Sequence, residues 1–176
     1  MGKRSDFVRR ANDAYFTPEA AVLPLLPHLP CGTIFVEPCA GDGRLVHHLE
    51  KHGMSCLSMF DIEPQHEEVD RADALGLVAA TEMAEPSVDC IITNPPWSRP
   101  ILHAMIDTFR RIRPTWLLFD ADWAHTKQAA PYLPYCRKIV SVGRVKWIED
   151  SKMTGKDNVA WHRFEAVPGD TLFFGR

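Results

Sequence analysis

Two consecutive prolines directly after a buried apolar segment place the firmest constraint on how this chain folds. Residues 88–92 read Val-Asp-Cys-Ile-Ile, a pattern typical of a buried strand. Pro95 and Pro96 cannot continue a strand because they lack the amide hydrogen and fix φ. Asn94 is held extended by the proline that follows it. The strand must therefore end here, where it presents a side-chain amide, two carbonyls and the indole ring of Trp97.

This Asn-Pro-Pro-Trp segment, residues 94–97, suits a reaction at an amino group on a flat ring. Such a nitrogen is a poor nucleophile because its lone pair is delocalised into the ring. Two acceptors, the Asn94 side-chain oxygen and the Pro95 carbonyl, would hold its two hydrogens and favour a tetrahedral, more reactive nitrogen. Trp97 would stack on the ring and hold the amine in line with an electrophile. A plain Pro-Pro turn at a strand end is the alternative that the segment alone leaves open.

The segment resembles the catalytic motif of S-adenosylmethionine (SAM)-dependent amino-methyltransferases, especially the DNA adenine-N6 methyltransferases. The resemblance implies direct SN2 transfer of a methyl group from SAM to the N6 amine of adenine in DNA, with Asn94, Pro95, Pro96 and Trp97 as catalytic residues. Related motifs occur in RNA adenine or guanine amino-methyltransferases and in glutamine-N5 protein methyltransferases, because their targets are also conjugated NH groups. A SAM-binding partner module without catalysis is a further alternative.

A strand, a glycine-rich turn and a helix follow one another in the first third of the chain. Residues 33–37 predict the strand and residues 44–52 the helix. Gly41 and Gly43 let the backbone between them approach a ligand closely. The Rossmann dinucleotide fingerprint requires a third glycine where Val46 stands, so a dinucleotide site is not indicated.

Glu37, Gly41 and Gly43 are similar to the SAM-binding motif of class I methyltransferases. Glu37 supplies a carboxylate that would face the ammonium group of SAM, and the glycines leave room for the cofactor. An acidic residue before a generic turn is the plainer alternative.

Further cofactor contacts follow from the resemblance. Residues 15–18 (Tyr-Phe-Thr-Pro) resemble the N-terminal motif that lies against the methionine part of SAM, although a helix capped by Thr17 explains them equally well. The end of the second predicted strand, 57–60, is where this topology grips ribose hydroxyls, which favours Asp61 over Glu63. The predicted cofactor-binding residues are Phe16, Thr17, Glu37, Pro38, Ala40, Gly41, Gly43, Asp61, Ile62, Asp73 and Asn94.

Two of these assignments leave alternatives. Ile62 is expected against the adenine face and Asp73 at the adenine amine of the cofactor. Asp70 is a near competitor of Asp73, and helix capping by Asp73 accounts for the same sequence.

The remaining elements predict the fold class. Residues 101–109 form an amphipathic helix, and 115–120 and 138–142 are strands, whereas 159–166 and 171–174 are predicted to form a closing hairpin. Strands and helices that alternate in this way predict an α/β three-layer sandwich with a mostly parallel twisted sheet. The resemblance adds a Rossmann-like sheet of seven strands with an antiparallel last strand.

Four residues are weaker candidates for substrate contacts. Trp123 follows the strand 115–120 at the edge where the other motifs lie. Trp147, Lys152 and Lys156 belong to the loop after the sixth strand, which in the resembling enzymes often holds the flipped base. A core position is the alternative for Trp147. No metal is expected, because Asp120 and Asp122 have no histidine or third carboxylate at ligand spacing.

Composition sets the remaining expectations. The 176 residues suit one methyltransferase domain, 1–176, with residues 1–12 as a basic arm that is either flexible or in contact with a polyanion. The net charge of −3 is not that of a strong nucleic-acid binder, but the chain from Arg137 onward carries eight Lys and Arg against five Asp and Glu. The five cysteines are scattered without a Cys-x-x-Cys pair, and no apolar segment resembles a signal or a membrane span, so a cytoplasmic protein is expected.

The implied partner is nucleic acid, most directly DNA. No separate target-recognition domain is expected in 1–176, since little sequence remains outside the predicted fold. Base recognition is then expected from the loop 147–158, from the second subunit of a homodimer or from a specificity partner.

Overall fold

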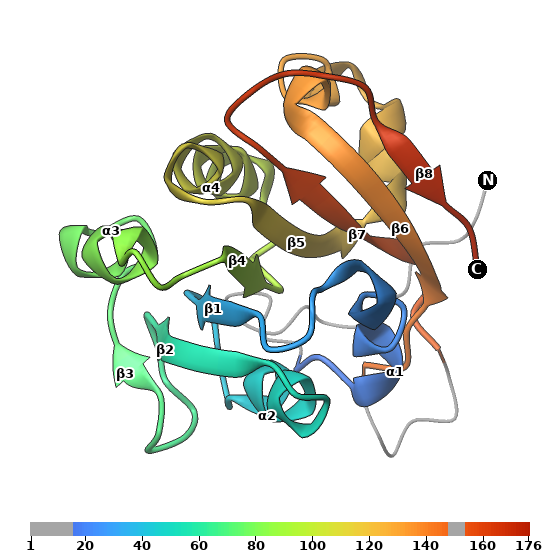
Figure 1. Cartoon of the computed structure of the whole chain (residues 1–176). Helices are drawn as coiled ribbons and strands as arrows, with labels where there is room; N and C mark the ends of the chain where they lie inside the picture. The colour runs from blue at the N-terminus through green and yellow to red at the C-terminus, as the bar shows by residue number, and fades with distance from the viewer. Residues whose placement is uncertain (1–15, 148–153) are drawn as a thin grey trace.

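The computed structural model describes residues 16–147 and 154–176, and its strands form one sheet that lies between two layers of helices (Figure 1). The sheet order is β3-β2-β1-β4-β5-β7-β6-β8. The strands are β1 (Ile34–Glu37), β2 (Ser55–Asp61), β3 (Asp70–Arg71), β4 (Cys90–Thr93), β5 (Thr115–Asp120), β6 (Cys136–Arg144), β7 (Asn158–Phe164) and β8 (Leu172–Phe174). The predicted three-layer α/β fold is therefore confirmed.

Strand direction follows the expected pattern. The pairs β3·β2, β2·β1, β1·β4 and β4·β5 are all parallel, whereas β7 runs antiparallel between β5 and β6. The carboxyl ends of β1, β2 and β4 therefore meet at one edge, and the chain leaves β1 and β4 in opposite directions along the sheet. Such a switch point is where open α/β sheets bind ligands.

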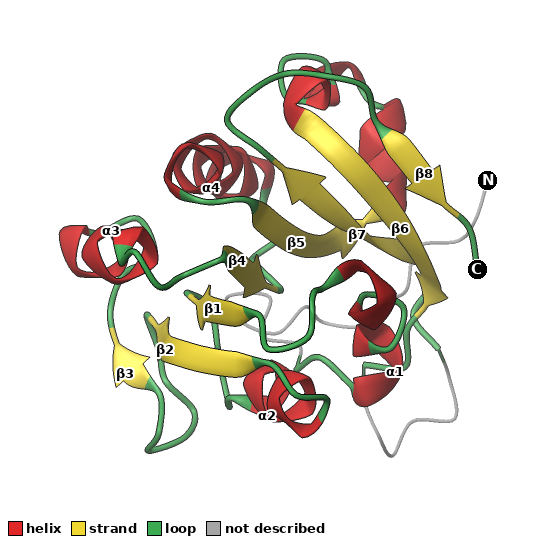
Figure 2. Ribbon diagram, in the orientation of Figure 1, coloured by secondary structure: helices red, strands yellow, loops and turns green. Residues whose placement is uncertain are grey.

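Each face of the sheet is covered by its own helices (Figure 2). On one face lie α1 (Glu19–Val22) and α2 (Arg44–Lys51), and on the other lie α3 (Leu77–Ala84) and α4 (Arg99–Ile112). The connecting 3-10 turns are η2 (Leu26–His28), η3 (Ala121–His125), η4 (Lys127–Ala129) and η5 (Leu133–Tyr135). In α4, Leu102, Met105, Ile106 and Phe109 are buried at helical spacing, which is why this segment packs as an amphipathic helix.

The predicted closing hairpin is wrong. β8 does not pair with β7; it lies parallel to β6 at the outer edge of the sheet. The sheet has one strand more than the seven expected, and the strand that was not predicted is β3. The segment between β7 and β8 forms hydrogen bonds with residues at the start of β6 instead. The Gly169 N–H donates to the Pro134 carbonyl at 2.8 Å, and the Thr171 hydroxyl donates to the Cys136 carbonyl at 2.6 Å.

Three local features also differ from the sequence prediction. The N-cap of α1 is Pro18, not Thr17, and no side chain caps this helix. Helix α3 falls in a weakly patterned segment because Leu77 and Val78 at its start are 84% and 64% exposed, so they hide the helical periodicity. The edge strand β3 has two exposed residues and no apolar signal. Over the described residues, no helix is both long and apolar enough to span a bilayer.

Candidate active site

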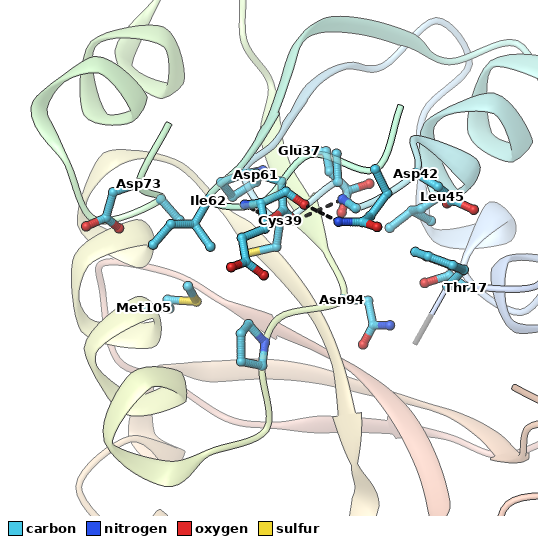
Figure 3. Close-up of a pocket in the computed structure, with 18 of the residues that line it drawn as sticks. Thr17, Glu37, Cys39, Asp42, Leu45, Asp61, Ile62, Asp73, Asn94 and Met105 are labelled. Atoms are coloured by element: carbon cyan, nitrogen blue, oxygen red, sulfur yellow. Dashed lines mark hydrogen bonds between the residues drawn. The ribbon is translucent and has the colours of Figure 1, made fainter. Parts of the chain in front are cut away.

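A cavity of about 380 Å³ opens at the carboxyl ends of β1, β2 and β4, at the switch point of the sheet (Figure 3). We call it the strand-end cavity. Its lining residues are Phe16, Thr17, Glu37, Pro38, Cys39, Ala40, Gly41, Asp42, Leu45, Asp61, Ile62, Glu63, Gln65, Asp73, Ala74, Leu75, Asn94, Pro96, Ile101 and Met105. The lining thus joins residues of three sequence motifs (15–18, 37–43 and 94–97), which are far apart in the chain, on one concave surface.

Glu37 is the buried carboxyl group of the strand-end cavity. It is the last residue of β1 and only 1% exposed. Burial raises the pKa of its carboxyl well above the usual value, although a hydrogen bond from the Asn94 backbone N–H opposes this. Within the described part of the chain, its Oε2 has no hydrogen-bond partner. A buried carboxylate oxygen without a partner favours a cationic or hydrogen-bond-donating ligand.

Asp61 fastens the glycine turn to the end of β2. One of its oxygens accepts from the Gly41 N–H at 2.9 Å, and the other accepts from the Glu63 N–H at 2.8 Å (Figure 3). Gly41 has φ +57°, and a Cβ there would lie 3.3 Å from Phe16 Cε1. The turn therefore depends on glycine both for its left-handed backbone and for the close approach of Phe16.

The acidic side of the strand-end cavity is extended by Asp73, whose carboxylate accepts from the Leu75 N–H at 2.9 Å. Its competitor Asp70 lies in β3 and does not line the cavity. Ile62 lines the cavity and is 58% exposed, an unusual state for isoleucine. An exposed aliphatic side chain at a cavity rim is suited to cover the face of a flat ring.

The Asn-Pro-Pro-Trp segment directly follows β4, as predicted. Asn94 and Pro96 line the cavity, whereas Pro95 is buried. The Trp97 indole N–H donates to the Leu118 carbonyl at 3.2 Å and lies 3.4 Å from Asn94 Oδ1. The ring of Trp97 is thus fastened to β5, and its longer contact with Asn94 holds that side chain at the end of β4.

Some predicted residues lie away from the strand-end cavity. Gly43 is the N-cap of α2 with φ +78°, and a Cβ there would contact His47, Met59 and Val69. Trp123 is wrong as a pocket wall: it is fully buried against α4, where its indole N–H donates to His103 Nε2 at 3.0 Å.

The loop candidates have separate positions. Trp147 is partly exposed and meets Trp97 edge-on, with ring centroids 5.9 Å apart. Lys156 is exposed and does not line the cavity, and Lys152 lies outside the described residues. Among the residues that the structure describes, no group of three or more His, Cys, Asp or Glu side chains is placed to hold a metal ion.

Several residues that line the cavity were not assigned to the site by the sequence analysis. Cys39, Asp42 and Leu45 are neighbours of the glycine turn, and Gln65 is fixed because its N–H donates to the Gly41 carbonyl at 2.9 Å. Cys39, Asp42 and Leu45 could have been predicted from their position within or next to the segment 37–43. Ile101 and Met105 come from α4 and keep the same helical spacing as its core residues, so no sequence pattern separates them from the core.

Comparisons with known proteins identify the fold. No protein-family model and no curated protein matches the sequence. Among solved structures, a Listeria monocytogenes protein assigned to the class I SAM-dependent methyltransferases is similar with a TM-score of 0.58 and 11% identity, over 97% of this chain and 68% of that one. A dimethyladenosine transferase from Plasmodium falciparum has a TM-score of 0.52 and 14% identity, over 88% of this chain and 62% of that one.

A third similar structure is the methyltransferase subunit of a type I restriction-modification system from Streptococcus thermophilus. Its TM-score is 0.52 at 10% identity, over 92% of this chain and 47% of that one. The chain therefore spans less than two thirds of the length of two of these three proteins. The chain has the fold of the class I methyltransferases, with a strand-end cavity where open α/β sheets of this kind bind their ligands.

Proposed function

We propose that this protein is a SAM-dependent methyltransferase that acts on the exocyclic N6 amine of adenine in DNA. The observation that carries the proposal is the meeting of Asn94 and Pro96 with Glu37 and Asp61 on the wall of one cavity. An amine-orienting segment and a candidate cofactor site are thereby adjacent. Their separation along the chain makes a coincidental Pro-Pro turn a poor explanation.

The residues of the strand-end cavity fit SAM. The unpartnered Oε2 of Glu37 suits an ammonium group, and Gly41 leaves its Cβ position open beside Phe16. Asp61 keeps acceptor capacity on both oxygens after its two backbone hydrogen bonds, which suits ribose hydroxyls, and Ile62 is placed to cover the adenine ring. When bound, SAM supplies an electrophilic methyl group on a sulfonium.

The chain's own residues then prepare the target amine. Asn94 Oδ1 exchanges its 3.4 Å contact with Trp97 for a shorter bond from the N6 amine. A second acceptor, the Pro95 carbonyl, takes the other hydrogen, so that the nitrogen lone pair turns toward the methyl group. On transfer, the bond from N6 to the methyl carbon would form as the carbon–sulfur bond breaks, with S-adenosylhomocysteine as the leaving group. The methylated N6 would carry a positive charge and lose its proton to solvent, so no buried general base is required.

The target base must leave its stack to reach a cavity of this kind, either by flipping or from a single strand. DNA as the partner is supported by the fold similarity to a restriction-modification methyltransferase subunit. The similarity to a dimethyladenosine transferase makes RNA the second substrate class to test. Trp147, which lies edge-on to Trp97, is proposed to flank the base.

The test is transfer of labelled methyl from SAM to duplex DNA, single-stranded DNA, RNA and ribosomal proteins, with nucleoside analysis of the product. Asn94→Ala should lower the rate by at least about 100-fold, as loss of one oriented transition-state contact does. Gln128→Ala, which removes an exposed side-chain amide on η4 that lines neither concave site, is the matched control and should leave the rate unchanged.

N6-methyladenine in DNA that disappears in Asn94→Ala is the expected result. Label in RNA or protein would overturn the substrate while keeping the chemistry of the Asn-Pro-Pro-Trp segment. No label on any substrate, with SAM still bound, would leave a SAM-binding module and overturn the catalytic proposal.

A further inference from the structure

A second concave site, next to the strand-end cavity, carries three cationic side chains. This hollow of about 360 Å³ is lined by Pro18, Ala20, Ala21, Val142, Arg144, Val145, Lys146, Thr154 and Arg176. We call it the basic hollow. Among the lining residues that the structure describes are Arg144, Lys146 and Arg176 and no Asp or Glu. A concave surface that carries several positive charges raises the local concentration of anions.

The three cations of the basic hollow are available to a ligand. Arg144, Lys146 and Arg176 are all exposed, and within residues 16–147 and 154–176 none of them forms an ion pair. The nearest acidic residue on α1, Glu19, is occupied elsewhere: it bonds Lys51 at 2.8 Å and His52 at 3.1 Å. The positive charge of the hollow is therefore not neutralised by the described part of the protein.

Backbone geometry places these side chains together. The pairing register of β6 with β7 shifts between Ser141 and Gly143, and such a bulge re-aims the strand that follows. Gly143 has φ +84°, and a Cβ there would lie 2.8 Å from Arg176 Nη1. The glycine thus leaves space for the Arg176 guanidinium to lie against β6, beside Arg144.

Consecutive residues of the chain connect the basic hollow with the strand-end cavity. Thr17 lines the cavity, and the next residue, Pro18, lines the hollow. On its other side, Lys146 is followed by Trp147, whose ring contacts Trp97 at 5.9 Å between centroids. Consecutive Cα atoms are about 3.8 Å apart, so Lys146 lies next to Trp147, whose ring meets the Trp97 ring at the segment that would hold the target base.

We propose that the basic hollow binds neighbouring backbone phosphates of the substrate nucleic acid, next to the nucleotide whose base enters the strand-end cavity. The inference rests on the proposed function, because only a nucleic-acid substrate supplies a phosphate at this distance from the base. Cations beside aromatic rings are a common arrangement for holding single or flipped strands. The contacts are to phosphate, so they position the strand without reading its sequence.

The experiment measures binding of a fluorescent DNA oligonucleotide, duplex and single-stranded, by anisotropy over a salt series. Arg144→Gln/Lys146→Gln is the test variant, and both positions are exposed, so the fold is retained. If each side chain neutralises one phosphate, the slope of log K against log salt falls by about 1.8 for duplex. The duplex affinity then falls about 60-fold at 0.1 M salt and about 9-fold at 0.3 M.

The matched control removes the same charge from the opposite face. Arg111→Gln/Lys127→Gln changes two exposed cations, on α4 and η4, and should leave affinity and slope unchanged. Arg176→Gln should reduce the slope by about 0.9 on its own. Calorimetry with S-adenosylhomocysteine should give the same affinity for all variants, since the strand-end cavity is untouched.

Equal salt slopes in the test variant and the wild type would overturn the phosphate site, as would an equal loss in the control variant. DNA methylation by the wild type would stand in either case, so the proposed function would survive that failure. A wild type that binds no nucleic acid at any salt concentration would overturn both proposals.

Discussion

Glu37→Gln should stabilise the folded protein at neutral pH while it weakens binding of the cofactor. The Glu37 carboxyl is 1% exposed, and burial raises its pKa well above the ordinary 4.5. The folded protein therefore retains a proton at pH values where the unfolded chain has lost it. The free energy of unfolding falls as pH rises from 4.5 to the raised pKa, by about 1.4 kcal/mol for each unit of the shift.

Glutamine avoids this cost because it has no charge to bury, and its oxygen still accepts from the Asn94 N–H. The variant and the wild type should differ little at pH 4, and the advantage of the variant should grow to about 1.4 kcal/mol per unit of pKa shift by pH 8. Chemical denaturation at pH 4, 6 and 8 measures this difference. Glu63→Gln, at the exposed rim of the same cavity, is the control and should not change the pH profile.

Ligand binding should change in the opposite direction. An ammonium group beside the Glu37 carboxylate lowers its pKa, so binding releases a proton below the raised pKa. The affinity for S-adenosylhomocysteine then rises up to about tenfold per pH unit in that range, and calorimetry should show this rise in the wild type only. A variant that is less stable than the wild type at pH 8 would refute the buried-charge argument. An unchanged affinity would refute the assignment of Glu37 to the ammonium group.

Three further outcomes test other parts of the structure. Burial lowers the pKa of His162 from 6.5 to about 3, so stability should fall by up to about 1.4 kcal/mol per pH unit as pH drops through that range, and His162→Phe should flatten the profile in denaturation experiments. Gly41→Ala adds a Cβ 3.3 Å from Phe16 at φ +57°, and calorimetry should show about tenfold weaker S-adenosylhomocysteine binding, from about 1–2 kcal/mol of strain. Trp97→Phe loses the N–H bonded to the Leu118 carbonyl and should unfold about 1 kcal/mol more easily, with methyl transfer retained because the ring remains.

The residues predicted for the site that line the strand-end cavity include a polar residue at the end of each of three strands. Glu37 ends β1, Asp61 ends β2 and Asn94 follows β4, and parallel neighbours bring such ends to one edge. The strands can be predicted because they are runs of apolar residues, and their ends can be predicted because a charged or amide residue follows each run. These two signals together predict the edge of the sheet and the chemistry on it.

The remaining errors have a common cause, since each depends on contacts distant in sequence. Trp123 lies near a strand end as Glu37, Asp61 and Asn94 do, but its indole N–H bonds to His103 on α4 and the ring is buried in the core. Ile101 and Met105 have the spacing of core residues, and only the position of α4 beside β4 turns them toward the cavity. The short connection between β7 and β8 suggests a hairpin, but the Thr171 hydroxyl donates to the Cys136 carbonyl and directs β8 to the edge of β6.

The two concave sites divide the work of recognising a substrate. The strand-end cavity carries a buried carboxylate and fixed backbone bonds, so it discriminates between small ligands by charge and shape. The charged residues that line the basic hollow in the described part of the chain are exposed cations, and phosphate contacts give affinity and orientation that are equal for every base sequence. Arg144 and Lys146 can therefore hold a strand in place without choosing the target. Any preference for the bases around the target adenine must come from side chains that reach base edges.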